Sequence, residues 1–430
     1  MIKPSLLKGF RDSKPDQEIV KKEVVRLLED QFTHYGFVPI DTPALEYTDV
    51  LLGKGGGETD KQIFHFIDHG NRDVALRFDL TIPFARFVAL NYNDLAFPFK
   101  RFHIAKVWRG ENPQKGRYRE FFQCDFDIVG TTSVLADLEI LTMMYSSLRT
   151  LGLDKFVIKV AHRGLFNAFL ENHNLLGKSV EILRTVDKKA KISTQELIDL
   201  LNEITKDEKA TNSILNYIDT DSKLSNNQLI DKLALLSGNE KEHSERLKTI
   251  FEHLKELEIE KYFQIDPSIT RGLDYYTGIV FETYLTQLEQ IGSVCSGGRY
   301  DNLTSLYSKH QLSGVGSSIG LDRLLAALEE LDNPLLASHP SSDVLIVNQG
   351  EEFDKLNLAV CAKLRNDNIK CDLYLDDKKI INQYKYAEQN QIRYSLTVQD
   401  ENSYILRDLK KRTNSETLDY QQLVATLKEK

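Results

Sequence analysis

The residues best suited to ligand chemistry lie at positions 271 to 278, Arg-Gly-Leu-Asp-Tyr-Tyr-Thr-Gly. Arg271 supplies a cation, and Tyr275 and Tyr276 supply two rings that each carry a hydroxyl group. Such a set can hold a small planar or charged ligand, and the glycines let the backbone approach it closely. An apolar, β-prone run follows at Ile279, so the stretch is expected just before a strand. Taken alone, it is also compatible with a tyrosine-rich strand that begins with an exposed arginine.

A second candidate is the stretch from Leu76 to Pro83, Leu-Arg-Phe-Asp-Leu-Thr-Ile-Pro. Strict alternation predicts a strand with Arg77, Asp79 and Thr81 on its polar face. A carboxylate and a hydroxyl on one face can bind an ammonium group. The alternative is a solvated sheet face, which is common in antiparallel sheets.

Residues 101 to 130 are predicted to form a hairpin with its turn at 110 to 117. On the return strand, alternation places Gln123, Asp125 and Asp127 on one face. These carboxylates and this amide can recognise a polar ligand through hydrogen bonds. The opposite, apolar face is expected to be the core side and carries Phe122, Cys124, Phe126 and Ile128.

The turn of this hairpin reads Glu-Asn-Pro-Gln-Lys-Gly-Arg from residue 111 to residue 117. It combines the amide of Gln114 with the cations of Lys115 and Arg117. That combination suits phosphates or the end of a nucleic acid. Plain solvated charge is the alternative for such a loop.

Two glycine-containing segments follow in the second half of the chain. Residues 293 to 301 place two glycines directly before Arg299, where a charged donor and close backbone approach coincide, although a simple turn would have the same composition. Residues 314 to 328 predict a glycine-rich strand that opens a helix, with Arg323 in the first turn, where an arginine can reach a triphosphate. The alternative is that the glycines serve only the packing of the helix on the sheet. Neither the phosphate-loop pattern nor the dinucleotide pattern G-x-G-x-x-G is present in this segment.

These segments must be held by a larger framework, and the pattern along the chain indicates one. Residues 16 to 35 have the apolar spacing of an amphipathic helix, and residues 68 to 130 alternate strands and turns as in an antiparallel sheet. Helical periodicity dominates residues 165 to 262, where glycine is rare. A proline- and serine-containing stretch at 332 to 342 reads as a linker. Beyond it we expect a small α/β unit with strands at residues 344–347, 370–375 and 393–398.

Composition limits the class of protein. A chain of 430 residues is expected to form two or three domains, and 41% hydrophobic with 28% charged residues is typical of a soluble globular protein. No apolar run reaches the roughly 18 residues of a membrane helix, and the first residues, Met-Ile-Lys-Pro, show no apolar signal region, so we expect a cytoplasmic protein without membrane contact.

Cysteine spacing and charge narrow the possible partners. The four cysteines are scattered without close pairs, which predicts free thiols and no metal site. The net charge of -9 means that any nucleic-acid partner must be met by local patches. Residues 341 to 430 hold 14 Lys and Arg against 15 Asp and Glu, a net of -1, so charge does not identify them as an RNA binder.

Taken in order, these segments resemble the histidyl-tRNA synthetases, a family of class II aminoacyl-tRNA synthetases. Thr42-Pro-Ala-Leu-Glu46 resembles the first class motif, the hairpin around Arg109 the second, and Gly320-Leu-Asp-Arg323 the third. Arg271-Gly-Leu-Asp-Tyr-Tyr276 and Ser296-Gly-Gly-Arg-Tyr-Asp301 resemble the two signatures of the histidine enzymes. The resemblance covers nearly the whole chain.

The resemblance implies an α+β protein. Its catalytic domain, built on the antiparallel sheet of class II synthetases, would comprise residues 1–164 and 263–331. A helical insertion would occupy residues 165–262, and after the linker at 332–342 an α/β anticodon-binding domain would occupy residues 343–430. Asp79 stands where many bacterial members carry glutamate, which is closer to the eukaryote-type branch.

The resemblance also implies an activity: activation of L-histidine with ATP to histidyl-adenylate, then transfer to the 3′ end of tRNA(His). The histidine ammonium would lie by Asp79, Thr81 and Gln123, and the imidazole by Asp127 and Tyr276. The implied histidine-binding residues are Asp79, Leu80, Thr81, Arg109, Gln123, Asp127, Arg271, Tyr275 and Tyr276.

For the chemical step, the resemblance makes Arg109 and Arg271 the catalytic residues at the α-phosphate, and Arg323 the contact of the γ end. Arginine suits phosphate because its fork of donors binds two oxygens at once. The implied ATP-binding residues are Arg109, Glu111, Arg119 and Arg323, and those of the tRNA acceptor end are Gln114, Lys115 and Arg117. Mg²⁺ would accompany ATP, and the protein would be a homodimer in the cytoplasm.

Two related functions are alternatives. One is the regulatory subunit of ATP phosphoribosyltransferase in histidine biosynthesis, a paralogue that does not charge tRNA. That paralogue generally lacks the anticodon domain and has degraded signatures. In this chain we expect the anticodon domain and intact signatures. The other is a synthetase-like sensor of uncharged tRNA within a larger kinase, which the intact arginines disfavour.

Overall fold

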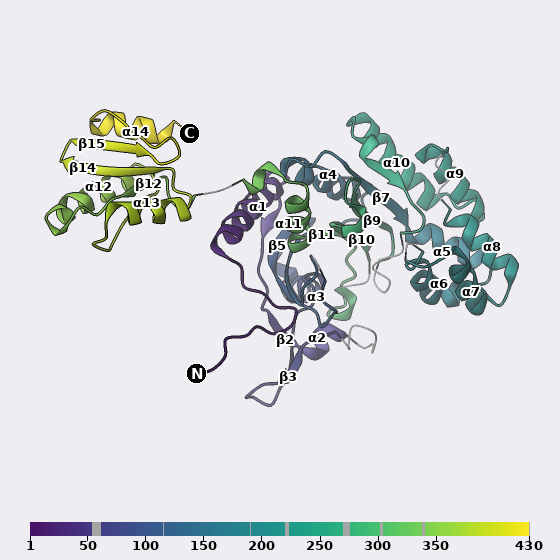
Figure 1. The fold of residues 1–430 in the computed structure, drawn as a ribbon. Helices are drawn as coiled ribbons and strands as arrows, with labels where there is room; N and C mark the ends of the chain where they lie inside the picture. The colour runs from purple at the N-terminus through teal and green to yellow at the C-terminus, as the bar shows by residue number, and fades with distance from the viewer. Residues whose placement is uncertain are drawn as a thin grey trace. The chain divides into compact units, whose positions relative to one another are not determined.

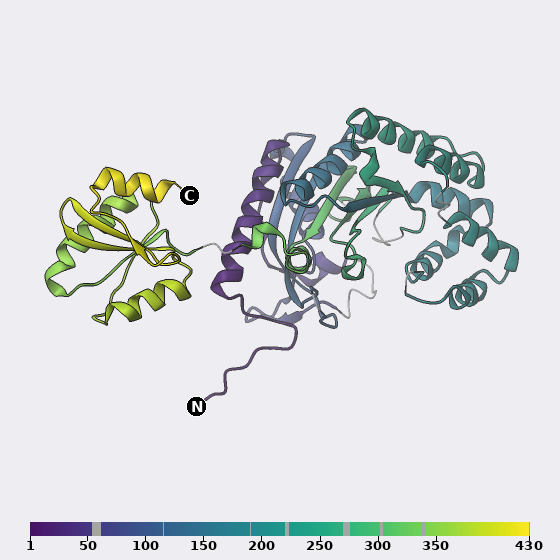
Figure 2. The same ribbon diagram turned by 45° about the horizontal axis from the view of Figure 1, so that its top comes forward.

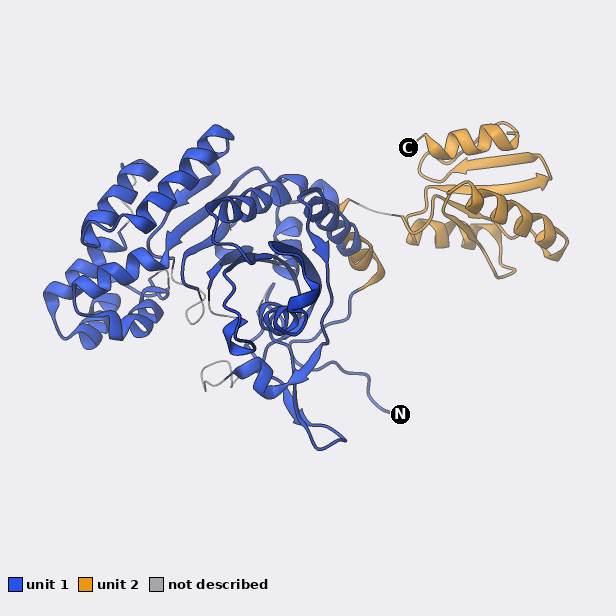
Figure 3. Ribbon diagram, turned by 180° about the vertical axis from the view of Figure 1, so that it is seen from behind, with its two compact units in different colours: residues 1–13, 21–335 blue, residues 14–20, 336–430 orange. Residues whose placement is uncertain are grey.

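The structure is a computed structural model of the 430-residue chain. It forms two compact units, residues 1–13 with 21–335 and residues 14–20 with 336–430, shown in blue and orange in Figure 3. Within the described part of the chain, no helix is both long and apolar enough to cross a membrane. The described residues are 1–53, 62–114, 116–189, 191–219, 223–269, 276–301, 304–337 and 340–429.

The first unit is built on an eight-stranded sheet with the order β1-β5-β6-β11-β10-β9-β7-β8 (Figure 1). The six strands from β5 to β7 pair antiparallel, and β1 and β8 join the two ends in parallel. The largely antiparallel sheet predicted from the sequence is therefore confirmed. Its strands are β1 Val38–Pro39, β5 Phe99–Trp108, β6 Glu120–Val129, β7 Phe156–His162, β8 Phe263–Ile265, β9 Ile279–Leu285, β10 Cys295–Tyr300 and β11 Gly314–Gly320.

One face of this sheet is apolar and covered by helices. Phe32 of α1 (Pro15–His34) packs against Phe102 and Phe126 with tilted rings, whose centroids lie 5.5 and 5.0 Å from that of Phe32. Helices α4 (Val134–Thr150) and α11 (Leu321–Glu330) contact β6 on this side as well. Because alternate side chains of a strand point to opposite faces, the polar residues of β6 must point away from these helices.

The predicted strand at residues 76 to 83 is wrong, and so is the prediction that residues 68 to 130 hold only strands and turns. β4 (Asp73–Leu76) ends at Leu76, the first residue of the predicted strand, and helix α3 (Thr81–Leu90) begins at Thr81. The Asp79 carboxylate accepts a hydrogen bond from the Ile82 N–H at 3.0 Å and so caps the start of the helix. Pro83 fits the first helical turn, where no N–H donor is required.

Strand β4 instead lies at the centre of a separate three-stranded sheet with the order β2-β4-β3. Its neighbours are β2 (Leu45–Tyr47) and β3 (His65–Ile67), and the short helix α2 (Thr48–Leu52) follows β2. Both pairings are antiparallel.

Between β7 and β8 the described chain forms helices, and both views place them on the side of β7 away from β5 (Figures 1 and 2). In α10 the residues Leu247, Ile250, Phe251 and Leu254 are buried, which is the spacing of one helical face. The segment comprises α5 Arg163–Asn172, α6 Ser179–Val186, α7 Thr194–Thr205, α8 Glu208–Tyr217, α9 Asn226–Leu236 and α10 Glu242–Glu256.

The second unit contains a five-stranded sheet with the order β13-β12-β14-β15-β16. Three of its strands pair in parallel: β12 (Val344–Ile346), β13 (Cys371–Leu373) and β14 (Tyr394–Asp400). β12 and β13 lie within strands predicted from the sequence, and β14 extends the third predicted strand to residue 400. β15 (Ser403–Asp408) and β16 (Thr413–Asn414) were not predicted and pair antiparallel. Helices α12 Asp354–Asn366, α13 Ile380–Gln389 and α14 Tyr420–Lys428 complete the unit.

Candidate active site

The polar face of the main sheet carries a buried cluster at its centre. Gln123, Asp125 and Asp127 alternate along β6 as the sequence predicts, and their exposed fractions are 9%, 2% and 3%. The register places Ser318 opposite Asp125 and Gly316 opposite Asp127 on β11. A sheet face with two buried carboxylates is not a solvated surface, because buried charges require partners.

Asp127 has a partner on each of its oxygens. Arg101, which is fully buried, places Nη2 2.6 Å from Oδ2, and the Tyr300 hydroxyl donates to Oδ1 at 2.8 Å. The Arg101 guanidinium also lies 4.1 Å from the centre of the Phe84 ring. Burial raises the pKa of Asp127, while Arg101 and the Tyr300 hydrogen bond oppose the rise. Asp127 is thereby held in one orientation.

Arg101 and Tyr300 were not among the predicted site residues. The signal for Arg101 was present in the predicted hairpin, because the register pairs it directly with Asp127. Tyr300 lies 173 positions from Asp127, and sequence spacing contains no information about that contact.

Gly316 is required by the position of Asp127. A Cβ atom at this residue would lie 1.9 Å from Asp127 Oδ1 and 2.9 Å from the Phe126 carbonyl oxygen. Any side chain here would displace the carboxylate. Gly316 thus lets the Asp127 side chain lie close to the backbone of β11, and it does not form a turn.

The start of α3 brings the predicted residues Asp79, Leu80 and Thr81 to the same cluster. The Leu80 carbonyl accepts a hydrogen bond from Arg101 Nη2 at 3.5 Å, so Arg101 joins α3 to β6. Asp79 is 8% exposed, and burial raises its pKa to about 6, while Arg109 and Arg101 act in the opposite direction. The helix start, not a strand face, therefore presents this carboxylate.

Two acceptors in the cluster have no hydrogen-bond donor among the described residues. Gln123 donates Nε2 to Ser318 Oγ at 2.8 Å, but its Oε1 is buried without a partner, and so is Oδ1 of Asp125. Burial raises the pKa of Asp125 to about 7, and the charges of Asp127 and Asp79 add to the rise. These two acceptors lie in a cluster that also contains the carboxylates of Asp79 and Asp127. A ligand with a cationic hydrogen-bond donor would satisfy them.

A cavity of about 170 Å³ lies next to this cluster and is bordered by Arg109, Arg117 and Arg323. Arg109 donates Nε to the Phe78 carbonyl at 2.8 Å, and Arg323 donates Nη1 to the Ser293 carbonyl at 2.6 Å. Two positioned guanidinium groups on one cavity suit a phosphate-bearing ligand. The lining residues are Arg109, Glu111, Gly116, Arg117, Phe121, Gln123, Ser293, Val294, Cys295, Ser296, Ser318, Gly320, Asp322 and Arg323.

The hairpin turn contributes a second, more open hollow. Gln114 and Arg117 exchange two backbone hydrogen bonds of 2.9 Å, and both border the hollow. Arg117 also pairs with Glu111, which borders both cavities. Among the predicted tRNA-binding residues, Lys115 lies outside the described residues.

Arg119 is placed differently from the other predicted ATP-binding residues. It does not border the cavity of Arg109, and it donates Nε to the Glu111 carbonyl at 3.1 Å and Nη1 to the Lys8 carbonyl at 3.4 Å. In this structure it ties the hairpin turn to the N-terminal segment.

Of the tyrosine-rich stretch, only the end is described. Arg271 and Tyr275 lie outside the described residues, whereas Tyr276 packs with Ala85 and Tyr300. Tyr276 therefore adjoins the residue that holds Asp127.

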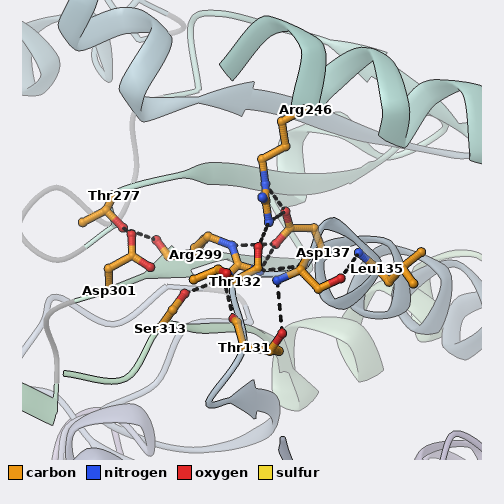
Figure 4. A network of polar contacts seen from close by, with 10 residues as sticks. Thr131, Thr132, Leu135, Asp137, Arg246, Thr277, Arg299, Asp301 and Ser313 are labelled. Atoms are coloured by element: carbon orange, nitrogen blue, oxygen red, sulfur yellow. Dashed lines mark hydrogen bonds and ion pairs between the residues drawn. The ribbon is translucent and has the colours of Figure 1, made fainter. Parts of the chain in front are cut away.

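Arg299 is turned away from the pocket, and the two glycines before it lie in β10 rather than in a turn. Its guanidinium donates Nε and Nη2 to Asp137 Oδ1 at 2.8 and 2.6 Å, as Figure 4 shows. The charged donor expected at a ligand is instead a buried structural contact.

The raised pKa of Asp125 yields a prediction for stability. A carboxyl whose pKa is raised by folding binds more protons when folded, so its favourable contribution is complete below pH 4 and is lost as the pH rises through 7. The ligand-free protein should lose about 2 kcal/mol from this group between pH 5 and pH 8.

Asp125→Asn removes the titrating group and should flatten this loss. Thermal unfolding across that pH range measures it, with Asp94→Asn at an exposed position as the control. Equal pH dependence in Asp125→Asn and the parent would contradict the assignment.

Comparison with known proteins agrees with this geometry. The histidyl-tRNA synthetase model matches residues 9–324, and the anticodon binding domain model matches residues 343–430. The histidine–tRNA ligase of Treponema denticola is 48% identical over 97% of this chain and 96% of that protein. That of Rhodopirellula baltica is 44% identical over 90% of this chain and 88% of that protein.

Solved structures show the same fold. The crystal structure of histidyl-tRNA synthetase from Nostoc sp. has a TM-score of 0.87 at 29% identity and covers 100% of this chain and 99% of that one. An ATP phosphoribosyltransferase regulatory subunit/histidyl-tRNA synthetase from Bacillus halodurans, at 24% identity and a TM-score of 0.75, covers 92% of this chain and 99% of that one and shares the fold. Together, the family match and the relatives show that this chain belongs to the histidyl-tRNA synthetase family.

Proposed function

We propose that this protein is a histidine–tRNA ligase that acts in the cytoplasm, where translation takes place. The observation that carries the proposal is the junction of two sites in a member of this family. A buried acidic cluster, centred on Asp127, adjoins a cavity that Gln123, Arg109 and Arg323 border. The first suits a small cationic amino acid and the second suits the phosphates of ATP.

Histidine recognition follows from the partners already present. Asp127, held by Arg101 and Tyr300, accepts a hydrogen bond from the imidazole, and Tyr276 adjoins it. A site built to pair polar groups rejects analogues that leave those groups unpaired. Tyr275 would complete the ring contact.

The α-ammonium group would lie among the carboxylate of Asp79, the hydroxyl of Thr81 and the free Oε1 of Gln123, with the buried side of Leu80 behind it. An ammonium group has three donors and no acceptor. It therefore supplies what the pocket lacks.

In the first step, a carboxylate oxygen of histidine attacks the α-phosphorus of ATP, and the bond to the departing pyrophosphate breaks. Negative charge builds on the non-bridging oxygens, and positioned donors stabilise it. Arg109, anchored through Nε, and Arg271 would act at the α-phosphate, and Arg323 at the γ end. Mg²⁺ typically binds one or two carboxylates with substrate phosphates, and Glu111 and Asp322 are the carboxylates that border the cavity.

In the second step, a hydroxyl of the terminal ribose of tRNA(His) attacks the carbonyl carbon of histidyl-adenylate, and AMP leaves. We propose that Gln114, Lys115 and Arg117 contact the acceptor end, because Gln114 and Arg117 border the open hollow of the hairpin turn and Arg117 also borders the cavity. Arg119 would act on ATP only indirectly, through the turn that it anchors.

We propose that the chain divides its work between domains. Residues 1–164 and 263–331 would form the catalytic domain, residues 165–262 the helical insertion and residues 332–342 the linker. Residues 343–430 would read the anticodon, which is supported by their match to the anticodon binding domain model.

We further propose a homodimer, joined through the first class motif. Several large apolar side chains near this motif are exposed to solvent. Exposed apolar patches on a protein surface mark interaction sites. These side chains are Val38, Leu45, Tyr47, Phe66 and Ile67, with exposed fractions between 40% and 61%.

Sedimentation of the parent and of Phe66→Glu at micromolar concentration tests the dimer. The parent should sediment as a dimer, and Phe66→Glu should shift it toward the monomer, because a charge in an apolar interface is costly. A monomeric parent would contradict the proposal.

Exchange of radioactive pyrophosphate into ATP tests the activity. It should depend on histidine and on none of the other amino acids, because adenylate formation is reversible and requires the matched substrate. The same protein should then charge tRNA(His). Histidine binding without exchange would favour a regulatory paralogue instead.

Truncation separates the two domains. A protein that ends at Ala337 retains every residue of the pocket and should keep pyrophosphate exchange within about threefold of the parent, as expected when domains are independent. Charging of tRNA should fall steeply, because the proposed anticodon contacts are gone. Undiminished charging would show that residues 343–430 do not read the tRNA.

A further inference from the structure

Strand β10 has different partners on its two faces. Ser296 borders the cavity, a Cβ atom at Gly298 would lie 3.0 Å from the Tyr276 ring, and Tyr300 holds Asp127. Alternation places Arg299 on the opposite face, away from all three. A displacement of this strand would therefore move both sides of the histidine pocket.

On that opposite face, Asp137 of α4 bridges two arginines from distant parts of the chain (Figure 4). It is fully buried, and Oδ1 accepts from Arg299 while Oδ2 accepts from Arg246 Nε at 2.7 Å. Arg299 donates further to the carbonyls of Thr131 and Ser133 at 3.0 and 3.3 Å.

Arg246 comes from α10, so one of the two cations on Asp137 belongs to the helical segment. Its Nη2 also donates to the Thr132 carbonyl at 3.0 Å, so it is held by the α4 start as well. Without Arg246, Oδ2 of this buried carboxylate loses its charged donor and is left as an unsatisfied acceptor, although Arg299 still balances the charge. The arrangement of Asp137 and Arg299 thus depends on where α10 lies.

Arg299 in turn holds the residues that follow Tyr276. Its carbonyl accepts from the Thr277 N–H at 2.8 Å, and the Thr277 hydroxyl donates to Asp301 at 2.5 Å. A Cβ atom at Gly278 would lie 3.0 Å from Cβ and Cδ of Arg299, so this backbone packs directly on the arginine side chain.

We propose that Arg246 is a positioning residue for the histidine pocket, which couples the helical segment to substrate binding through Asp137 and Arg299. The inference rests on the proposed function. It assigns the helical segment a part in adenylation, before any tRNA is bound. Removal of the Arg246 guanidinium lets β10 shift. Tyr276 and the Tyr300 hydroxyl, which orients Asp127, are then less precisely positioned.

The test compares Arg246→Ala with Lys248→Ala in pyrophosphate exchange. Lys248 lies on the same helix and pairs only with Asp231 and Glu245 among the described residues, all within the helical segment. Arg246→Ala should raise the KM for histidine about 3- to 30-fold, the range for residues that couple distant sites. The KM for ATP should stay within twofold, and Lys248→Ala should change neither constant.

Arg246→Lys should recover part of the loss, because it returns the charge to Asp137 without the fork of donors. If Arg246→Ala does not fold, Arg246→Lys is judged alone by the same two constants. An unchanged KM for histidine, or an equal rise for both substrates, overturns the proposal. A fall in kcat alone overturns it as well, since it would indicate general damage.

Calorimetric titration of the same variants with histidine separates this inference from the proposed function. A parent that binds histidine but shows no exchange contradicts the ligase activity only. Equal histidine affinities in the parent and in Arg246→Ala contradict the coupling only.

Discussion

The ion pair of Arg101 and Asp127 is the contact on which the rest of the pocket depends. Both side chains are buried, and Nη2 lies 2.6 Å from Oδ2. Removal of two charges from water costs several kcal/mol per ion, so such a pair persists only where further donors and acceptors complete it. Here the additional groups are the Tyr300 hydroxyl and the Leu80 carbonyl. Each of them fixes an element of the fold around the pocket: β10 through Tyr300 and α3 through Leu80.

This arrangement places three buried carboxylates, Asp79, Asp125 and Asp127, around one fully buried arginine. Asp79 and Asp125 have raised pKa values, about 6 and about 7, because burial disfavours their charged forms and Arg101 cannot neutralise every carboxylate. A cationic amino acid that enters such a site restores the balance, and the carboxylates then ionise beside it. In the proposed function, the cluster therefore favours a cationic substrate by its charge.

The contrast between Arg299 and the other arginines shows how one residue type serves two purposes in this fold. Arg109 and Arg323 border the cavity and each donates to a backbone carbonyl, whereas Arg299 is 5% exposed and makes contacts with Asp137, Thr131 and Ser133. The difference lies in where the backbone places each arginine: Arg299 lies on β10 with its side chain on the face toward α4, whereas Arg109 follows the end of β5 and Arg323 lies in the first turn of α11.

Local patterns in the sequence determined much of this protein. The alternation of β6 predicted the shared face of Gln123, Asp125 and Asp127, and the glycine-rich run predicted the strand β11 followed by helix α11, because both depend on periodicity and on backbone freedom near in sequence. Only the tertiary structure decided which partners those residues have. Residues 76 to 83 alternate like a strand, yet the Asp79 cap and tertiary packing begin a helix there. Asp127 meets Tyr300 across 173 positions, and Arg299 meets Asp137 across 162. Such contacts are set by strand order and register, which depend on how the whole sheet packs against its helices and not on any local pattern.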